Sequence, residues 1–306
     1  MLQTPDERIR LIRFTRQSLD DARLKSIPIV AGVGGLSTRE TVRLAHEASE
    51  AGASVRPEHR DTPACHLHID SDAGMVILPA YYAASLAADE DQIVQYFVDI
   101  CEASPIPILL YNFPANAAGL DMSSAVIERI MERAPNLCGV KLTCGGNIAK
   151  LIRLTAAVRN NATISSSRPF PFLFLDGLVA DLTPWMHCGG HGTVSGLPNF
   201  APLVCVTLWN LLNKAAPNEE EVAEAARLQD ILSRADVAAV PAGVRGMKFV
   251  LHRLHGYGGA PRKPLLPMKE EDGEKFLTAL RDLLAAEAEL EGSGQNIHTD
   301  LVRFIS

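Results

Sequence analysis

The sequence predicts an α/β protein with a parallel sheet covered by helices on both faces. Short apolar runs alternate with amphipathic, helix-like segments along most of the chain. The apolar runs are continuous, which is typical of parallel strands buried on both sides. With 306 residues, of which 47% are hydrophobic and 21% charged, the chain is long enough for one barrel and an appendage.

The elements follow in order from a helix signal at Thr4-Pro-Asp-Glu7. Thr4 suits the N-cap, Pro5 the first helical position and Glu7 the capping box, so we expect a helix to about Leu19. The same patterns predict strands at residues 27–33, 75–82, 107–113, 137–143, 171–175 and 192–196, and helices at 37–51, 90–103, 123–133, 148–158 and 182–188. From about Leu203 to Leu290 the pattern is helical, with one helix opening at Glu219 and a late one over 268–286.

Lys141 stands in the middle of the apolar strand predicted at 137–143. An ammonium group inside such a strand is costly unless it is paired or neutral. A desolvated lysine loses its proton more easily and becomes a nucleophilic amine, as in Schiff-base enzymes. The structural alternative is a snorkelling or ion-paired lysine.

Tyr111 closes the preceding apolar strand, thirty residues before Lys141. A strand, a crossover helix and a parallel strand need about 30 residues, so the two residues should end neighbouring strands. Alternation puts Gly139, Lys141 and Thr143 on one strand face and Tyr111 on a face of its own strand. If both faces point inward, a phenol, an amine and a hydroxyl converge.

At these residues the chain resembles the class I aldolases and synthases typified by N-acetylneuraminate lyase and dihydrodipicolinate synthase. The matching segments, in the same order through nearly the whole chain, are Gly32-Val-Gly-Gly35, Tyr111-Asn-Phe-Pro114, Gly139-Val-Lys-Leu-Thr143, Gly189-Gly-His-Gly-Thr-Val-Ser-Gly196 and Gly256-Tyr-Gly-Gly-Ala-Pro-Arg262. The resemblance implies a TIM (β/α)8-type barrel with a C-terminal helical extension. We expect the barrel at 1–202 and the last barrel helix with the helical region at 203–306.

The resemblance also implies roles for individual residues. Lys141 would form a Schiff base with the keto carbon of a 2-oxo acid, and Tyr111 would shuttle protons. Thr143 would hydrogen-bond the substrate and Gly177 would line the pocket, while Tyr82 matches a tyrosine that reaches into a neighbouring subunit's site. Such enzymes need no metal or organic cofactor, and they assemble as homodimers or homotetramers.

Ser195 is a further candidate, because a tight glycine-rich turn at residues 189–192 would leave it as an inward hydroxyl. The same glycines could instead form a phosphate loop, although no lysine or serine follows at the required spacing. His187 and His191 stand at this turn, near the start of a strand, and are expected to be structural. Tyr81 could equally be one half of an aromatic packing pair.

The segment after Tyr111 helps to distinguish between the reactions that this family catalyses. Dihydrodipicolinate synthases carry an arginine shortly after this turn, where the present chain has Asn116 among small residues. It therefore resembles more closely the aldolases for 4-hydroxy-2-oxoglutarate or 2-keto-3-deoxy sugar acids, which release pyruvate. A synthase-like activity is the alternative.

Two features depart from the family pattern. The six strands fall short of the eight of a closed barrel, and the carboxylate-binding turn that ends the family's second strand is absent, so we expect a barrel lacking its first two strands. The polar run at about 54–72 is longer than the usual αβ connection of about 2–6 residues, which indicates an insertion or an unspliced intron. A non-catalytic remnant of the family is the rival hypothesis.

The remaining signals exclude other classes of function. A net charge of −7 without a basic patch argues against nucleic-acid binding and membrane association. His59, His66, His68, Asp70 and Asp72 suggest a metal cluster, but a solvated loop is the simpler interpretation and we predict no metal site. The six cysteines show no metal or secretory spacing, and the start is too charged for a secretory signal. We expect a cytoplasmic protein with reduced thiols, a mitochondrial location being the alternative.

Overall fold

Six strands in the described part of the chain form one sheet in the order of the sequence. The computed structural model describes residues 3–52, 72–144, 147–162, 164 and 168–292. The strands are β1 (Val30–Gly32), β2 (Ala73–Ile77), β3 (Ile108–Asn112), β4 (Leu137–Leu142), β5 (Leu173–Asp176) and β6 (Gly192–Thr193). The sheet is parallel and its strands run consecutively, as in a (β/α) barrel. The predicted α/β, TIM-barrel-like class is confirmed, with β1 and β6 as the two edges of the described sheet.

Two compact units divide the chain. The first contains the described residues up to Leu175 together with Cys188–His191, and the second contains Asp176–His187 and the described residues from Gly192 onward. Backbone hydrogen bonds between β5 and β6 lie within each unit: His191 donates to the Phe174 carbonyl in the first, and Val194 to the Asp176 carbonyl in the second.

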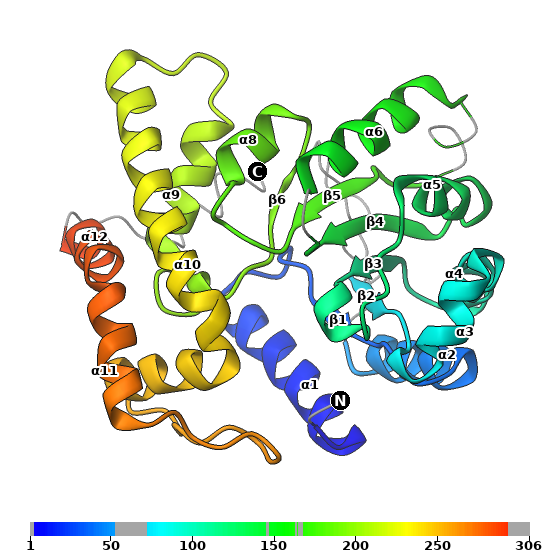
Figure 1. Ribbon diagram of the computed structural model, residues 1–306, viewed down its shortest axis with the longest axis horizontal. Coiled ribbons are helices and arrows are strands. Elements are labelled where there is room, and N and C mark those ends of the chain that lie inside the picture. The colour runs from blue at the N-terminus through cyan, green and yellow to red at the C-terminus, as the bar shows by residue number, and fades with distance from the viewer. Residues whose placement is uncertain (1–2, 53–71, 145–146, 163, 165–167, 293–306) are drawn as a thin grey trace. The chain divides into compact units, whose positions relative to one another are not determined.

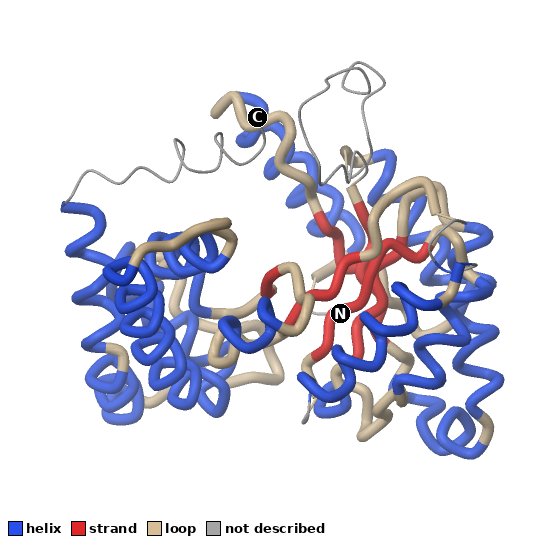
Figure 2. Tube along the Cα trace, turned by 90° about the horizontal axis from the view of Figure 1, so that it is seen from above, coloured by secondary structure: helices blue, strands red, loops and turns tan. Residues whose placement is uncertain are grey.

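The helices of the first unit flank its strands on one side (Figures 1 and 2). They are α1 (Pro5–Asp21), α2 (Thr38–Glu50), α3 (Ala83–Ala88), α4 (Glu90–Ala103), α5 (Ser124–Arg133) and α6 (Asn147–Asn160). Thr4 and Glu7 form the expected capping box at α1. Ser37, Asp89 and Ser123 likewise accept a backbone N–H at the start of α2, α4 and α5, so side chains satisfy part of each helix's first turn.

The two faces of this sheet differ in exposure. Val76 and Leu110 are completely buried, whereas Ile77 and Tyr111, the next residues of the same strands, are partly exposed. Because successive strand residues point to opposite faces, the helix-covered face holds the core. The other face carries Tyr111 and, by register, Lys141.

The second unit is mainly helical. It contains α8 (Leu182–His187), α9 (Pro202–Leu212), α10 (Glu219–His255), α11 (Glu270–Ala279) and α12 (Arg281–Gly292). Helix α10 begins with an Asn218–Glu221 capping box and contains a break at Gly243, two residues after Pro241. It ends at Gly256, whose φ of 70° is the left-handed conformation that glycine adopts at helix ends.

Some predicted boundaries were wrong. The strand expected to reach Tyr82 ends at Ile77, and Ala80–Tyr82 forms a 3-10 turn, η2, that leads into α3. The single late helix is two helices, α11 and α12. The run at 54–72 lies outside the described residues except for Asp72, which is buried 3.9 Å from Arg16.

Candidate active site

Lys141 and Tyr111 lie directly opposite each other near the carboxyl ends of β4 and β3. The parallel register pairs Tyr111 with Lys141 on one side and with Ile77 on the other. The Lys141 side chain extends over the phenol, with Nζ 4.2 Å from the ring centroid, and the residue is only 8% exposed. The predicted meeting of the amine and the phenol is therefore present, at the end of the strands where barrel enzymes hold their active sites.

The environment of Tyr111 keeps its phenol protonated. Burial raises its pKa above the usual value, and the nearby Thr143 hydroxyl opposes that rise. The ring also stacks on Phe113, with the centroids 5.5 Å apart. A neutral phenol retains its proton near pH 7 and is able to donate it to a developing negative charge.

Thr143 follows β4 and completes the group in the first unit. Its backbone N–H donates to the Asn112 carbonyl at 2.8 Å, which fixes the residue beside the end of β3. Its Oγ1 is buried and interacts with the Tyr111 phenol. The hydroxyl, the phenol and the amine are therefore grouped at the ends of β3 and β4.

The other predicted site residues come from other segments of the chain. Gly177 and Ser195 belong to the second unit, where Gly177 N–H donates to Asp176 Oδ1 at 2.6 Å and Ser195 Oγ accepts from Leu197 N–H at 3.3 Å. Tyr82 lies in η2, half exposed, with its ring packed edge-on against Tyr81. That contact matches the aromatic packing pair.

Asp176, which precedes Gly177, was not singled out from the sequence. It is completely buried at the end of β5. Burial and the neighbouring carboxyl of Asp181 together raise its pKa to about 8. The pair therefore holds a proton at neutral pH. An aspartate at the last position of an apolar strand is the sequence signal that could have identified it.

A second buried lysine, Lys150 in α6, also escaped the sequence analysis. It is 6% exposed, and its Nζ donates to Asp121 Oδ1 at 2.5 Å and to the Met122 carbonyl at 2.7 Å. Its position in the apolar stripe formed by Leu151 and Leu154 was the available signal. Lys150 is thus the ion-paired type of buried lysine that was considered for Lys141.

The two histidines of the glycine-rich segment make backbone contacts. His191 Nδ1 accepts from Phe174 N–H at 3.1 Å, and burial lowers its pKa, so the ring stays neutral. His187 Nδ1 lies 2.8 Å from the Thr183 carbonyl. In the described ranges no three His, Cys, Asp or Glu side chains are grouped to hold a metal ion; His59, His66, His68 and Asp70 of the suggested metal cluster lie outside those ranges.

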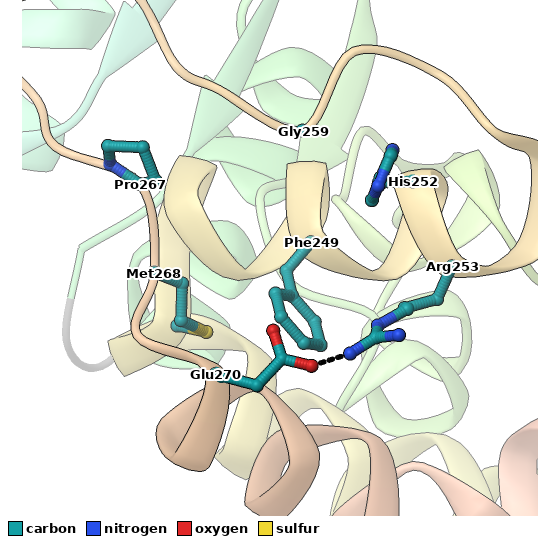
Figure 3. Close-up of a pocket in the computed structure, with 7 residues that line it drawn as sticks. All are labelled: Phe249, His252, Arg253, Gly259, Pro267, Met268 and Glu270. Carbon is teal, nitrogen blue, oxygen red and sulfur yellow. Dashed lines mark ion pairs between the residues drawn. The ribbon is translucent and has the colours of Figure 1, made fainter.

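A cavity of about 270 Å³ lies in the second unit, between the end of α10 and the start of α11. Figure 3 shows Phe249 at its centre and an ion pair between Arg253 and Glu270 at its edge. None of the predicted site residues lines it. The geometry of the reacting groups, and not this cavity, locates the candidate site.

Comparison with known proteins identifies the family. The sequence model of the dihydrodipicolinate synthetase family matches residues 68–283. The chain belongs to this family. It is a class I aldolase or lyase of the Schiff-base type, as the pairing of Lys141 with Tyr111 led us to expect.

Several family members are similar over most of the chain. An L-threo-3-deoxy-hexylosonate aldolase from Hypocrea jecorina is 31% identical over 291 residues, covering 94% of this chain and 82% of the relative. A protein of Emericella nidulans named "Probable 4-hydroxy-2-oxoglutarate aldolase, mitochondrial" is 32% identical, with 94% and 81% covered. A 4-hydroxy-tetrahydrodipicolinate synthase from Nitrobacter hamburgensis is 28% identical, with 86% and 75% covered.

Solved structures agree with the fold. A dihydrodipicolinate synthase family protein from Coccidioides immitis is 26% identical with a TM-score of 0.72, covering 94% of this chain and 82% of that one. YagE from Escherichia coli K12, solved in complex with pyruvate, is 24% identical with a TM-score of 0.69, covering 92% and 82%. In the described part of this chain no helix is long and apolar enough to cross a membrane.

Proposed function

We propose that this protein cleaves 4-hydroxy-2-oxoglutarate or a 2-keto-3-deoxy sugar acid, releasing pyruvate, through a Schiff base on Lys141. The observation that carries the proposal is the Lys141 amine held 4.2 Å from the centre of the Tyr111 ring at the carboxyl end of a parallel sheet. An amine that attacks a carbonyl and a phenol that moves protons are the two groups this reaction needs.

The reaction starts when the neutral Lys141 amine attacks the C2 keto carbon of the substrate. Loss of water gives an iminium ion at C2, which accepts the electron pair of the C3–C4 bond as that bond breaks. Removal of the proton from the C4 hydroxyl then breaks the C3–C4 bond, releases an aldehyde and leaves an enamine. Protonation at C3 and hydrolysis release pyruvate and restore the amine. We assign the proton transfers to Tyr111, whose phenol adjoins Lys141 and begins the cycle protonated. The phenol gives its proton to the departing hydroxide, and the phenolate that results takes the proton of the C4 hydroxyl. The restored phenol then protonates C3, and the phenolate takes a proton from the water that hydrolyses the imine.

The other residues would bind the substrate. Thr143 is assigned a hydrogen bond to the substrate, which the position of its buried Oγ1 beside the Tyr111 phenol supports. We also propose that Gly177 and Ser195 line the site, and that Tyr82 contributes from a second subunit, which its half-exposed ring allows. Homodimer or homotetramer assembly and a cytoplasmic or mitochondrial location are parts of the same proposal, to be tested by sedimentation and by imaging of a tagged chain.

Trapping with borohydride tests the role of Lys141. Incubation with pyruvate and borohydride should leave a carboxyethyl group on Lys141, which blocks tryptic cleavage there. The modified protein should then give a peptide of residues 134–150 in place of two shorter peptides that meet at Lys141. The Lys141→Arg variant should give no adduct. A wild-type adduct on any other lysine, or none, would contradict the assignment.

The choice of aldolase over synthase depends on Asn116. This residue is exposed in the turn Pro114–Asn116 after β3, near the position where a synthase carries arginine. The names of the Hypocrea jecorina and Emericella nidulans relatives favour an aldolase, and the Nitrobacter hamburgensis relative favours a synthase. We expect a higher kcat/KM for cleavage of 4-hydroxy-2-oxoglutarate or a 2-keto-3-deoxy acid than for condensation of pyruvate with aspartate semialdehyde. The opposite ratio would make the synthase the correct reading.

A further inference from the structure

A polar cluster lies directly behind the candidate site, on the helix-covered side of β3 and β4, with one of its members open to solvent. Its charged members are Lys150, whose side chain is 7% exposed, and Asp121, whose side chain is 47% exposed. Burial alone would raise the pKa of Asp121, but hydrogen bonds from Asn112 and Lys150 and the charge of Lys150 outweigh it, so the pKa lies below its usual value. Asp121 is therefore a carboxylate paired with an ammonium group.

The cluster joins the ends of both catalytic strands. Asn112, the last residue of β3, donates through Nδ2 to Asp121 Oδ1 at 2.7 Å and to Cys144 Sγ at 3.2 Å, and its Oδ1 accepts from Met122 N–H at 3.0 Å. Lys150 Nζ reaches Cys144 Sγ as well, at 3.4 Å. Burial raises the pKa of the Cys144 thiol, so the sulfur is a neutral acceptor in this arrangement.

A second set of bonds holds Thr143 and Cys144, the described residues that directly follow β4. Cys144 N–H donates to Asn147 Oδ1 at 3.0 Å, and Asn147 Nδ2 reaches the Leu142 carbonyl at 3.4 Å. Thr143 N–H closes the set on the Asn112 carbonyl. Four of the bonded residues are thus one to three positions along the chain from Tyr111 or Lys141, namely Asn112, Leu142, Thr143 and Cys144.

We propose that Lys150 is a positioning residue, which through Asp121, Asn112 and Cys144 sets the distance between the Lys141 amine and the Tyr111 phenol. The inference rests on the proposed function, because it concerns the geometry of that same pair. From helix α6, Lys150 contacts the connection after β3, at Asp121 and Met122, and the residue Cys144 after β4, the same three residues that Asn112 bonds from the end of β3. Its loss removes the cation that pairs with Asp121 and the side-chain donor to the buried Met122 carbonyl, so that Asn112 alone would join the two strand ends through Asp121 and Cys144.

The expected effect falls on turnover. A misplacement of about 1 Å in reacting groups lowers a rate by roughly 100-fold. We therefore expect the Lys150→Met variant to lose about 10- to 100-fold in kcat, with KM changed by less than about threefold. Because arginine keeps the charge and several donors, Lys150→Arg should recover part of the lost kcat.

A matched control separates positioning from general loss of stability. Arg16 is also buried, and it bonds the carbonyls of Leu24, Lys25 and Ile27, just before β1. Arg16→Met removes a buried cation of the first unit far along the chain from both strand ends. It should lower the thermal unfolding temperature as Lys150→Met does, while kcat measured below that transition stays within about twofold of wild type.

The measurements are kcat, KM and the rate at which pyruvate and borohydride label Lys141, in wild type and the three variants. The proposal is supported if Lys150→Met labels more slowly and has a lower kcat than wild type, and if Lys150→Arg recovers part of both losses. It also requires that Arg16→Met keeps the wild-type labelling rate and kcat. Equal kcat losses in Lys150→Met and Arg16→Met, or wild-type kcat in Lys150→Met, overturns it. Failure of the wild-type protein to label at Lys141 is a different result, since it overturns the proposed function itself.

Discussion

Replacing Asp176 by asparagine should make the second unit less sensitive to pH. Asp176 is completely buried, and its Oδ1 accepts the Gly177 and Leu178 N–H groups at 2.6 and 3.3 Å. Burial first, and then the carboxyl of Asp181, raise its pKa from 3.8 to about 8. Asparagine resembles the protonated acid, because it keeps an acceptor for the backbone and has a donor for Asp181.

The size of the effect follows from proton binding. Below pH 3.8 the carboxyl is protonated in both the folded and the unfolded chain, so its contribution is fully present. Between 3.8 and about 8 the folded state keeps a proton that the unfolded state has released, so the free energy of unfolding falls as the pH rises. Each pH unit corresponds to about 1.4 kcal/mol, which gives roughly 3 kcal/mol between pH 5 and pH 7.

Tryptophan fluorescence during urea unfolding measures this directly. The chain has two tryptophans, Trp185 and Trp209, and both belong to the second unit. Asp176→Asn should show a flatter dependence of unfolding free energy on pH than wild type and equal or greater stability at pH 7. Asp230→Asn, at an exposed carboxylate of the same unit, should retain the wild-type dependence. If wild type and Asp176→Asn had parallel pH curves, Asp176 would be ionised in the folded protein and the reasoning would be wrong.

Three further predictions concern packing. Gly139→Ala should lower the free energy of unfolding, measured in urea, by roughly 1–3 kcal/mol, because a Cβ there would lie 2.5 Å from a backbone oxygen of β5. The control Gly258→Ala, which has open space around it, should leave this free energy unchanged. Glu287→Ala should lower the free energy of thermal unfolding by about 2 kcal/mol, since it leaves two N–H groups at the start of α9 unpaired. The control Glu289→Ala, at an exposed position, should change this free energy by less than about 0.5 kcal/mol. Burial raises the pKa of the Cys138 thiol to about 12, so this cysteine should react with a disulfide reagent only in denaturant. Mass spectrometry detects the modification. Modified Cys138 in the native protein would contradict its burial.

Local signals predicted most elements well. Helix α4 begins and ends at the expected residues, Glu90 and Ala103, because Asp89 caps it and a Ser-Pro pair follows. The separation of α11 from α12 was missed because neither glycine nor proline marks it, and the chain turns at Leu280 through packing in the core. The 3-10 turn at Ala80–Tyr82 was absorbed into the strand before it, since tyrosines favour strands when judged alone.

The site was predictable to the extent that it depends on strand register. Tyr111 and Lys141 could be paired from their spacing, since one crossover sets it. The partners of Lys150 could not, because Asp121 lies 29 residues away in a connection of irregular structure. Asp176 was passed over for a related reason: its raised pKa depends on burial and on Asp181, and neither follows from a periodic pattern.

The direct pairing of Tyr111 with Lys141 limits how this enzyme is able to change. Deleting one residue from the middle of β3 would turn the phenol to the opposite face of the sheet, because side chains alternate, and no adjustment of neighbouring residues would return it. The turn around Asn116 lies outside the ladder and is free of that constraint. Substitutions in the turns that follow the strands are therefore able to change the substrate that the enzyme accepts, while the lengths of β3 and β4 stay fixed.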